Sequence, residues 1–105
     1  MGWPVILTPQ SQEDLREIVT YIARDSPERA RTFGNILIDK ALSITAFPEM
    51  GQVVPEVADP SVREIIHGSY RIIYELVRDP NAVYVLRFWH GARGTPEINE
   101  SSQDI

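Results

Sequence analysis

The residues that could do chemistry lie in the second half of the chain, on three consecutive predicted strands. They are arginines, a histidine and two glutamates: Arg63, Glu64, Arg71, Glu75, Arg87 and His90. RNA cleavage needs little more, because the 2′-hydroxyl of the substrate attacks the neighbouring phosphorus while the protein supplies a base, an acid and a cation. Imidazole titrates near neutrality, so His90 is the candidate acid or base, with Glu64 or Glu75 as an alternative base. The three arginines would stabilise the charge that develops on the phosphate.

Each of these residues also has a purely structural interpretation. Arginine side chains often cover the exposed surfaces of strands. A histidine at the end of a strand, such as His90, commonly forms a hydrogen bond with its own turn. The pattern alone therefore leaves catalysis and structure as alternatives.

Other kinds of site find no support in the sequence. The two histidines, His67 and His90, have no carboxylate at metal-ligand spacing and form no H-x-x-x-H motif, and the chain has no cysteine. Glycine-rich phosphate-binding loops and a G-x-S-x-G nucleophile elbow are absent as well. We therefore expect no metal and no cofactor.

The composition is that of one small globular domain. The chain has 105 residues, 43% of them hydrophobic and 24% charged, with a formal net charge of −5, and this length supports a single core. No apolar run approaches the roughly 20 residues of a membrane helix, so we expect a cytoplasmic protein that does not bind a membrane. Residues 61–93 carry net +2, whereas residues 1–60 carry −4 and residues 94–105 carry −3. The overall acidity opposes nonspecific binding of nucleic acid, although the stretch 61–93 is locally positive.

Two helices precede the strands that carry the candidate residues. A short apolar strand at 3–7 leads into a helix that begins at Thr8-Pro9, where threonine caps and proline suits the first turn; a start at Ser11 is the alternative. Asp25-Ser26-Pro27 ends this helix and starts the next, which Phe47-Pro48 stops. The apolar stripes of the two helices predict a helical hairpin that faces the core.

The remaining elements complete an α+β fold. An irregular loop at 49–60 leads to strands at 62–67, 70–77 and 83–90. The order predicts an N-terminal edge strand, a helical hairpin and then a three-stranded antiparallel meander forming one sheet. Residues 1–96 would form the single domain, and residues 97–105 a flexible acidic tail.

Strict alternation along each strand predicts which side chains share a face of the sheet. On the last strand it predicts that the side chains divide between the two faces. One face would carry Tyr84, Leu86, Phe88 and His90, and the other face would carry Val83, Val85, Arg87 and Trp89. Both groups contain apolar residues, which favours a sheet covered on both faces, by a partner or in a dimer.

Several motifs within residues 4–95 are shared with a known family. They are Leu7-Thr8-Pro9, Tyr21-Ile22-Ala23, Phe47-Pro48-Glu49-Met50-Gly51, Tyr70-Arg71-Ile72-Ile73-Tyr74 and the stretch VLRFWHGAR at 85–93. With these motifs, of which the last two are the specific ones, the chain resembles the RelE/ParE superfamily of bacterial toxins from toxin–antitoxin (plasmid stabilisation) systems. The resemblance implies a helical hairpin on an antiparallel sheet, and an antitoxin whose disordered segment folds over the toxin.

The superfamily has two functional branches. RelE-like members are ribosome-dependent mRNA endonucleases, whereas ParE-like members inhibit DNA gyrase without being nucleases. The ending Leu86-Arg87…His90-Gly91-Ala92-Arg93 is closer to the ParE branch, and the chain has a single lysine, Lys40, where nuclease members carry a lysine-rich surface. The resemblance thus implies a gyrase inhibitor first and, as the alternative, a nuclease with Arg63, Arg71, Arg87 and His90 as its site. A member retained only for antitoxin binding is a third interpretation.

The expected partner surface is the arginine-bearing sheet. Its contact residues would be Arg71, Tyr74, Arg87, Trp89 and Arg93, and the guanidinium groups would neutralise an acidic antitoxin segment. The expected partners are the antitoxin and DNA gyrase, or the ribosome and mRNA under the nuclease alternative. Either a homodimer or a hetero-oligomer with the antitoxin would suit this surface.

Overall fold

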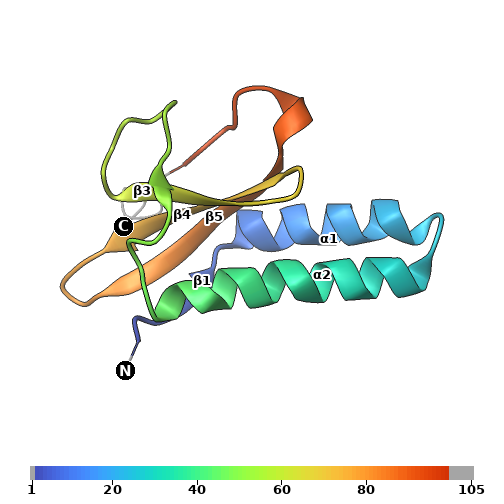
Figure 1. Ribbon diagram of the computed structural model, residues 1–105, viewed down its shortest axis with the longest axis horizontal. Helices are drawn as coiled ribbons and strands as arrows, with labels where there is room; N and C mark the ends of the chain where they lie inside the picture. Colours follow the sequence, from blue (N-terminus) through green and yellow to red (C-terminus); the bar gives the residue numbers. More distant parts are fainter. Residues whose placement is uncertain (1, 100–105) are drawn as a thin grey trace.

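The computed structural model describes residues 2–99 and places two long helices against one face of a single sheet (Figure 1). In chain order the elements are β1 (Val5–Leu7), α1 (Pro9–Ala23), α2 (Pro27–Leu42), the 3-10 turn η1 (Ser43–Thr45), β2 (Gln52–Val53), β3 (Val62–His67), β4 (Tyr70–Val77), β5 (Ala82–His90) and the 3-10 turn η2 (Gly91–Arg93). The two helices lie side by side and extend past the end of the sheet (Figure 1). No helix in this part of the chain has the length and apolar character needed to cross a membrane.

Both helices begin where the sequence predicts. Thr8 caps α1 by accepting a hydrogen bond from the Ser11 backbone N–H at 3.2 Å, with Pro9 in the first helical position. Ser26 caps α2 in the same way, through the Arg29 N–H at 3.2 Å. Because each cap satisfies a backbone donor that the helix itself leaves free, these residues fix the two starts. The alternative start at Ser11 is wrong.

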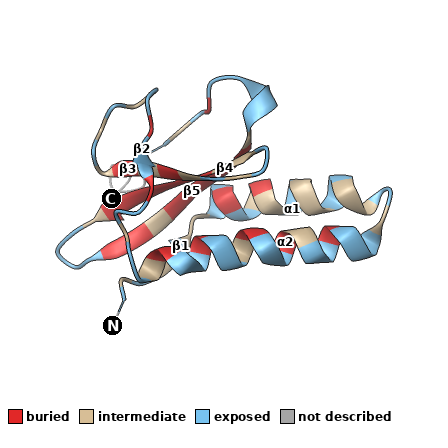
Figure 2. Cartoon of the chain, viewed as in Figure 1, coloured by how far each residue is buried: buried red, intermediate tan, exposed pale blue. Residues whose placement is uncertain are grey.

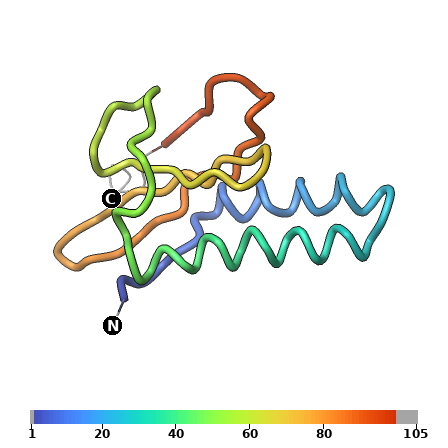
Figure 3. Tube along the Cα trace, viewed as in Figure 1, coloured from blue at the N-terminus to red at the C-terminus, as the bar shows by residue number. Residues whose placement is uncertain are grey.

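The sheet is larger than the predicted meander. It has five strands in the order β1-β5-β4-β3-β2. The meander β3-β4-β5 is present, and β1 lies at the edge as expected, but it pairs in parallel with β5, with Val5 opposite Val83. Figure 3 traces the chain from its N-terminal strand through the two helices and back to the sheet. The predicted loop 49–60 contains β2, which pairs with β3. Strands of two or three residues are too short to produce an alternating pattern, so the sequence could not indicate β2 or the partner of β1.

A β-bulge divides β5 into two halves with opposite phase. β5 has nine residues and β4 eight, and Ile73 pairs with Arg87 while Tyr74 pairs with Val85, so Leu86 is the additional residue. An extra residue reverses the inside–outside alternation beyond it. The predicted grouping of Leu86 with Phe88 is therefore wrong: Phe88 packs with the helices, and Leu86 packs on the opposite face of the sheet.

The sheet separates two apolar clusters, and Figure 2 shows buried residues both along the strands and on the two helices. The larger lies between the sheet and the helices and includes Leu37, Ile44, Ile72, Tyr74, Val85 and Phe88. The smaller lies on the other face and contains Val54, Val62, Ile73, Leu86 and Trp89. Val54 and Val57 belong to the segment 52–61, here called the strap, and Ile98 packs on the same cluster from the C-terminal side. The second apolar face, expected to need a partner or a dimer, is thus covered by the chain itself.

The predicted tail 97–105 falls partly outside the described residues, which end at Asn99. Within them, the Glu97 carbonyl accepts a hydrogen bond from Arg87 at 2.8 Å, and Ile98 packs on the smaller cluster. These two contacts join the C-terminal side of the domain to the sheet.

Candidate functional site

Arg87, a candidate for both catalysis and partner binding, points into the protein. Its Nε and Nη2 donate to the two carboxylate oxygens of Asp14 on α1, at 2.8 and 2.9 Å. The side chains of Arg87 and Asp14 are only 9% and 2% exposed. Hydrogen bonding to Asp14 raises the pKa of Arg87, against the opposing effect of burial. Arg87 therefore joins β5 to α1, and its charge is already balanced.

Arg71 fastens the strap to the sheet. Its Nε donates to Glu64 of β3, and its Nη1 and Nη2 donate to the two oxygens of Glu56 in the strap at 2.9 and 2.8 Å. The hydrogen bond with Glu56 raises the pKa of Arg71, and the same contact lowers the pKa of Glu56 to about 2. Two carboxylates thus surround one guanidinium, which leaves little positive charge for a phosphate or an acidic peptide.

Arg63 and Tyr74 hold the turn that precedes the strap, and Arg63 also binds the end of the strap. Arg63 donates to the carbonyls of Gly51 at 3.0 Å and Pro60 at 3.0 Å. The Tyr74 hydroxyl donates to the Pro48 carbonyl at 2.8 Å and accepts from the Gly51 N–H at 2.9 Å. Tyr74 is fully buried, and burial raises the pKa of its hydroxyl. Both side chains therefore have structural partners.

The end of β5 is more open. Nδ1 of His90 accepts from the Ala92 N–H at 3.0 Å, as the structural interpretation of this histidine expects, and the Tyr70 ring lies edge-on to it at 4.9 Å between centroids. Arg93 is exposed and stacks on the Trp89 ring at 4.0 Å. Trp89 is only 3% exposed, and its indole N–H donates to the Gly94 carbonyl.

The predicted constellation does not assemble. Arg63, Arg71 and Arg87 each bond to a different set of protein atoms, and the two candidate bases, Glu64 and Glu75, are 3% and 2% exposed. Among the expected partner contacts, burial removes Tyr74, Arg87 and Trp89 from the accessible surface. Arg93 alone of those five is exposed, while Arg71 is half-buried in its ion pairs. Each of the three arginines therefore has bonding partners within the fold, and both glutamates are buried.

An apolar groove opens instead where the helices extend past the sheet. It consists of two adjacent hollows of about 490 and 410 Å³ that share Tyr70. We call it the hairpin groove, and its lining includes Ile18, Tyr21, Ile22, Phe33, Ile36, Tyr70, Phe88, His90 and Arg93. Tyr21 is 69% exposed and Ile36 is 37% exposed. The predicted inner stripe does pack inward at this end, since Ala30 is buried and Ile18 and Phe33 pack against the larger cluster. The exposed Tyr21 and Ile36 are not part of that stripe, and the helices here extend past the sheet (Figure 1).

No metal site accompanies the groove. Within residues 2–99, no group of three or more histidine, aspartate or glutamate side chains is placed to hold a metal ion.

Replacing Glu56 with glutamine should show how much the ion pair between Glu56 and Arg71 contributes to stability, because this contribution depends on pH. The pKa of Glu56 is lowered from 4.5 to about 2 in the folded chain, so its charge stabilises the fold above the unfolded pKa and loses this effect as pH falls toward the folded pKa. We expect Glu56→Gln to unfold at lower urea concentration than the parent at pH 7, and the gap to close as pH approaches about 2. A gap that is the same at neutral and acid pH would contradict the ion pair's role.

Several solved structures share this fold, among them two chains from toxin–antitoxin systems. A chain of the chromosomal ParDE toxin–antitoxin system from P. aeruginosa superimposes with a TM-score of 0.68 at 16% identity, covering 85% of this chain and 96% of that one. A chain of the RelBE2 toxin–antitoxin complex from Mycobacterium tuberculosis gives a TM-score of 0.63 at 18% identity, covering 86% and 99%. The fold therefore places this chain in a class of small α+β proteins that includes these two toxin–antitoxin chains.

The family follows from the sequence. The sequence model of the family described as ParE toxin of type II toxin-antitoxin system, parDE, matches residues 5–94, and the chain belongs to this family. Among curated protein sequences, none matches the chain. The resemblance to the RelE/ParE superfamily is confirmed, on its ParE side.

Proposed function

We propose that this ParE-family toxin acts in the cytoplasm by binding and inhibiting DNA gyrase, and that a cognate antitoxin neutralises it. A protein that acts only by binding needs an accessible surface. It does not need an acid, a base and a cation held together at one site. The chain offers the hairpin groove and the exposed Arg93 as such a surface.

We favour gyrase inhibition over mRNA cleavage because the chain itself covers the face of the sheet that lies opposite the helices. Val54 and Val57 of the strap and Ile98 pack over Trp89 and Leu86. A nuclease must bring phosphate, base and acid together at about hydrogen-bond distance. Glu64 and Glu75 are buried in the sheet, and the arginines already have protein partners. The overall charge of −5 also opposes work within the phosphate field of a ribosome.

The hairpin groove suits the antitoxin. Its floor is apolar, and charges of both signs lie along it, with Glu17 and Glu28 as well as Arg29 and Arg93. A disordered segment that folds on binding can place an amphipathic helix in such a groove, with its apolar side chains against Phe33 and Ile36. This replaces the arginine-led docking expected from the sequence.

Purified toxin added to gyrase and relaxed plasmid tests the target directly. We expect supercoiling to fall with increasing toxin, and protein synthesis in a cell-free translation reaction to continue at the same toxin concentrations. The antitoxin encoded beside the toxin gene should restore supercoiling when added first. Induced expression should give filamentous cells with DNA damage signalling.

The nuclease alternative predicts the opposite pattern. Translation would then stop at once, mRNA would be cut on ribosomes, and gyrase would be unaffected. A chain that changes neither reaction but still binds its antitoxin would contradict both toxic activities and leave the third interpretation.

A further inference from the structure

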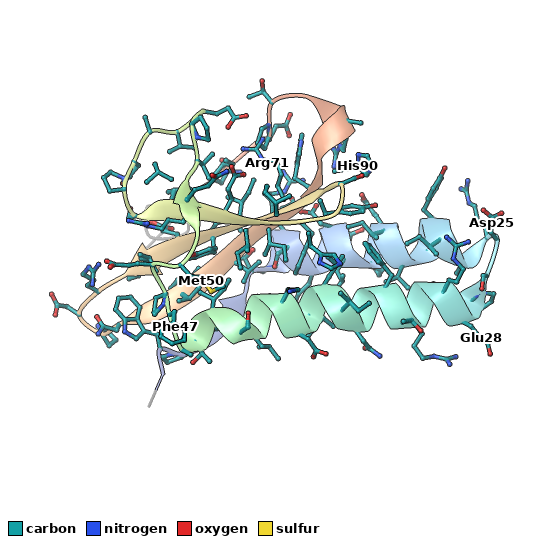
Figure 4. All side chains as sticks on the ribbon, viewed as in Figure 1. Asp25, Glu28, Phe47, Met50, Arg71 and His90 are labelled. Carbon is teal, nitrogen blue, oxygen red and sulfur yellow. The ribbon has the colours of Figure 1, made fainter. Side chains whose placement is uncertain are left out.

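The hairpin groove ends at a histidine whose ring caps the backbone. His90 is the last residue of β5, and Figure 4 shows it beside η2 and above α1. Its Nδ1 atom accepts a hydrogen bond from the Ala92 backbone N–H at 3.0 Å. The first N–H groups of a helical turn have no partner within the turn, so this bond stabilises the start of η2. The atom that accepts it is also one that can bind a proton.

The cap exists only while Nδ1 is unprotonated. A neutral imidazole carries a single proton, and Nε2 must hold it here because Nδ1 acts as an acceptor. The imidazolium ion has a proton on each nitrogen and no acceptor, so it cannot accept from the Ala92 N–H. Imidazole passes from one form to the other between about pH 5 and pH 8. Proton uptake by His90 therefore removes the cap.

The titratable and charged groups around His90 come from three elements, and together with it they line the smaller hollow of the groove, of about 410 Å³. They are Asp14, Glu17 and Tyr21 from α1, Tyr70 from β4 and Arg93 from η2. The charge of Asp14 is balanced by Arg87, so Glu17 favours proton uptake and Arg93 opposes it. Carboxylates, phenols and guanidinium groups ordinarily titrate outside the range of about pH 5 to 8. His90 is therefore the group in this hollow that changes charge near neutrality.

The bonds on either side of η2 keep the change local. Before η2, the Gly91 N–H donates to the Ser69 carbonyl at 2.7 Å. After it, the Trp89 indole N–H donates to the Gly94 carbonyl at 3.1 Å. Neither bond involves a group that titrates near neutrality. Loss of the cap should therefore loosen η2 while the strand before it and Gly94 after it stay in place.

We propose that His90 is a proton-controlled cap at the rim of the hairpin groove. With a neutral ring, η2 is closed and carries Arg93, whose guanidinium lies 4.0 Å from the centre of the Trp89 ring. With a protonated ring, the ratio of open to closed η2 rises about fivefold, which is the net effect of one hydrogen bond. The hollow then gains a positive charge, and Arg93 stacks less on Trp89. The inference concerns the toxin alone and does not depend on its cellular target.

An NMR titration of the isotope-labelled chain from about pH 8 to about pH 5 tests the cap. The Ala92 amide proton should move upfield as its hydrogen bond is lost, and its midpoint should coincide with that of the His90 ring protons. The Trp89 ring shifts the side-chain protons of Arg93 upfield while they are stacked, and this shift should shrink with the same midpoint. Arg87 is the internal reference: it lies 4.9 Å from the centre of the same ring, but its buried ion pair should hold it there.

Variants at His90 separate the cap from other effects of pH. His90→Asn keeps an acceptor that suits a cap and does not titrate, so Arg93 should stay stacked at every pH and the Ala92 amide should not move. His90→Ala has no acceptor, so Arg93 should be less stacked at every pH. The matched control is His67→Gln, which removes the other histidine, whose ring lies 6.1 Å from that of Phe33. It should leave the Ala92 titration unchanged.

Three results would overturn the inference. They are an Ala92 amide that stays still while the His90 ring titrates, an Ala92 titration that persists in His90→Asn, and Arg93 protons that stay constant while Ala92 moves. Loss of the Ala92 titration in His67→Gln would assign the pH dependence to the other histidine and would also overturn it. Every readout comes from the toxin alone, so this failure is distinguishable from failure of the gyrase assay.

Discussion

Replacing Asp14 with alanine is expected to lower the free energy of unfolding by about 3–5 kcal/mol, because it leaves the Arg87 guanidinium buried without its counter-charge. Asp14 accepts hydrogen bonds from Nε and Nη2 of Arg87 and from the Phe88 N–H at 3.1 Å. A single carboxylate thus joins the first helix to the last strand. Its loss removes these three bonds and a fourth from Gln10 Nε2 at 3.0 Å, at a carboxylate that is only 2% exposed.

Urea denaturation at neutral pH measures this effect, and two further variants define its origin. Glu13→Ala breaks the ion pair of Glu13 with Arg16 on the same helix, where the side chains are 42% and 73% exposed, and it should change stability little. The double variant Asp14→Ala/Arg87→Met should recover part of the loss, since it removes the buried charge as well. If the double variant were less stable than Asp14→Ala alone, the unbalanced charge would not be the cause.

Replacing Gly51 with alanine is the second large effect, expected at about 2–4 kcal/mol. A Cβ atom at this position would lie 2.5 Å from the Glu64 carbonyl oxygen and 2.6 Å from the Tyr74 hydroxyl oxygen. Neither atom can easily move, because one belongs to the backbone of β3 and the other is fully buried. The turn would have to leave the sheet, and the hydrogen bond from the Gly51 N–H would be lost.

Gly68 provides the matched control for Gly51. It has a φ of +58° in the β3–β4 turn, but an added Cβ would meet nothing within 4 Å. Alanine at position 68 would only have to adopt an unfavourable positive φ, which should lower the free energy of unfolding by about 1 kcal/mol. Thermal or urea unfolding of the two variants compares the loss of stability caused by a steric clash at position 51 with the loss caused by an unfavourable φ at position 68. Equal losses would mean that the close approach of Gly51 to β3 is not what requires glycine.

The sequence predicts the elements well because their signals are local. Thr8 and Ser26 cap helices through bonds to residues three positions away, and each precedes a proline that fits the first turn. The strands at 62–67 and 70–77 have the bounds of β3 and β4. The bulge at Leu86 leaves no comparable signal, since both phases of β5 place apolar residues on each face. An error in phase there exchanges Phe88 and Trp89 between the clusters.

The candidate site was harder to predict because charge partners come from distant parts of the chain. Nothing local in the sequence links Asp14 to Arg87, from which it is separated by 73 positions. A signal did exist: Asp14 precedes Ile18 by four residues and therefore falls on the inner face of α1, where a charge needs a counter-charge. The hairpin groove was also missed, since an apolar helical stripe does not reveal where the sheet beneath it ends.

The parallel pairing of β1 with β5 has a consequence for the order in which the chain assembles. Thr8 Oγ1 donates to the Val85 carbonyl across 77 positions, whereas the helical hairpin and the β4–β5 hairpin join neighbouring segments. Closing a long loop costs more entropy than closing a short one, and folding slows as contacts become less local. We therefore expect the helical hairpin and the β4–β5 hairpin to form early and β1 to pair with β5 last. The final step of folding would then close a loop that contains most of the chain.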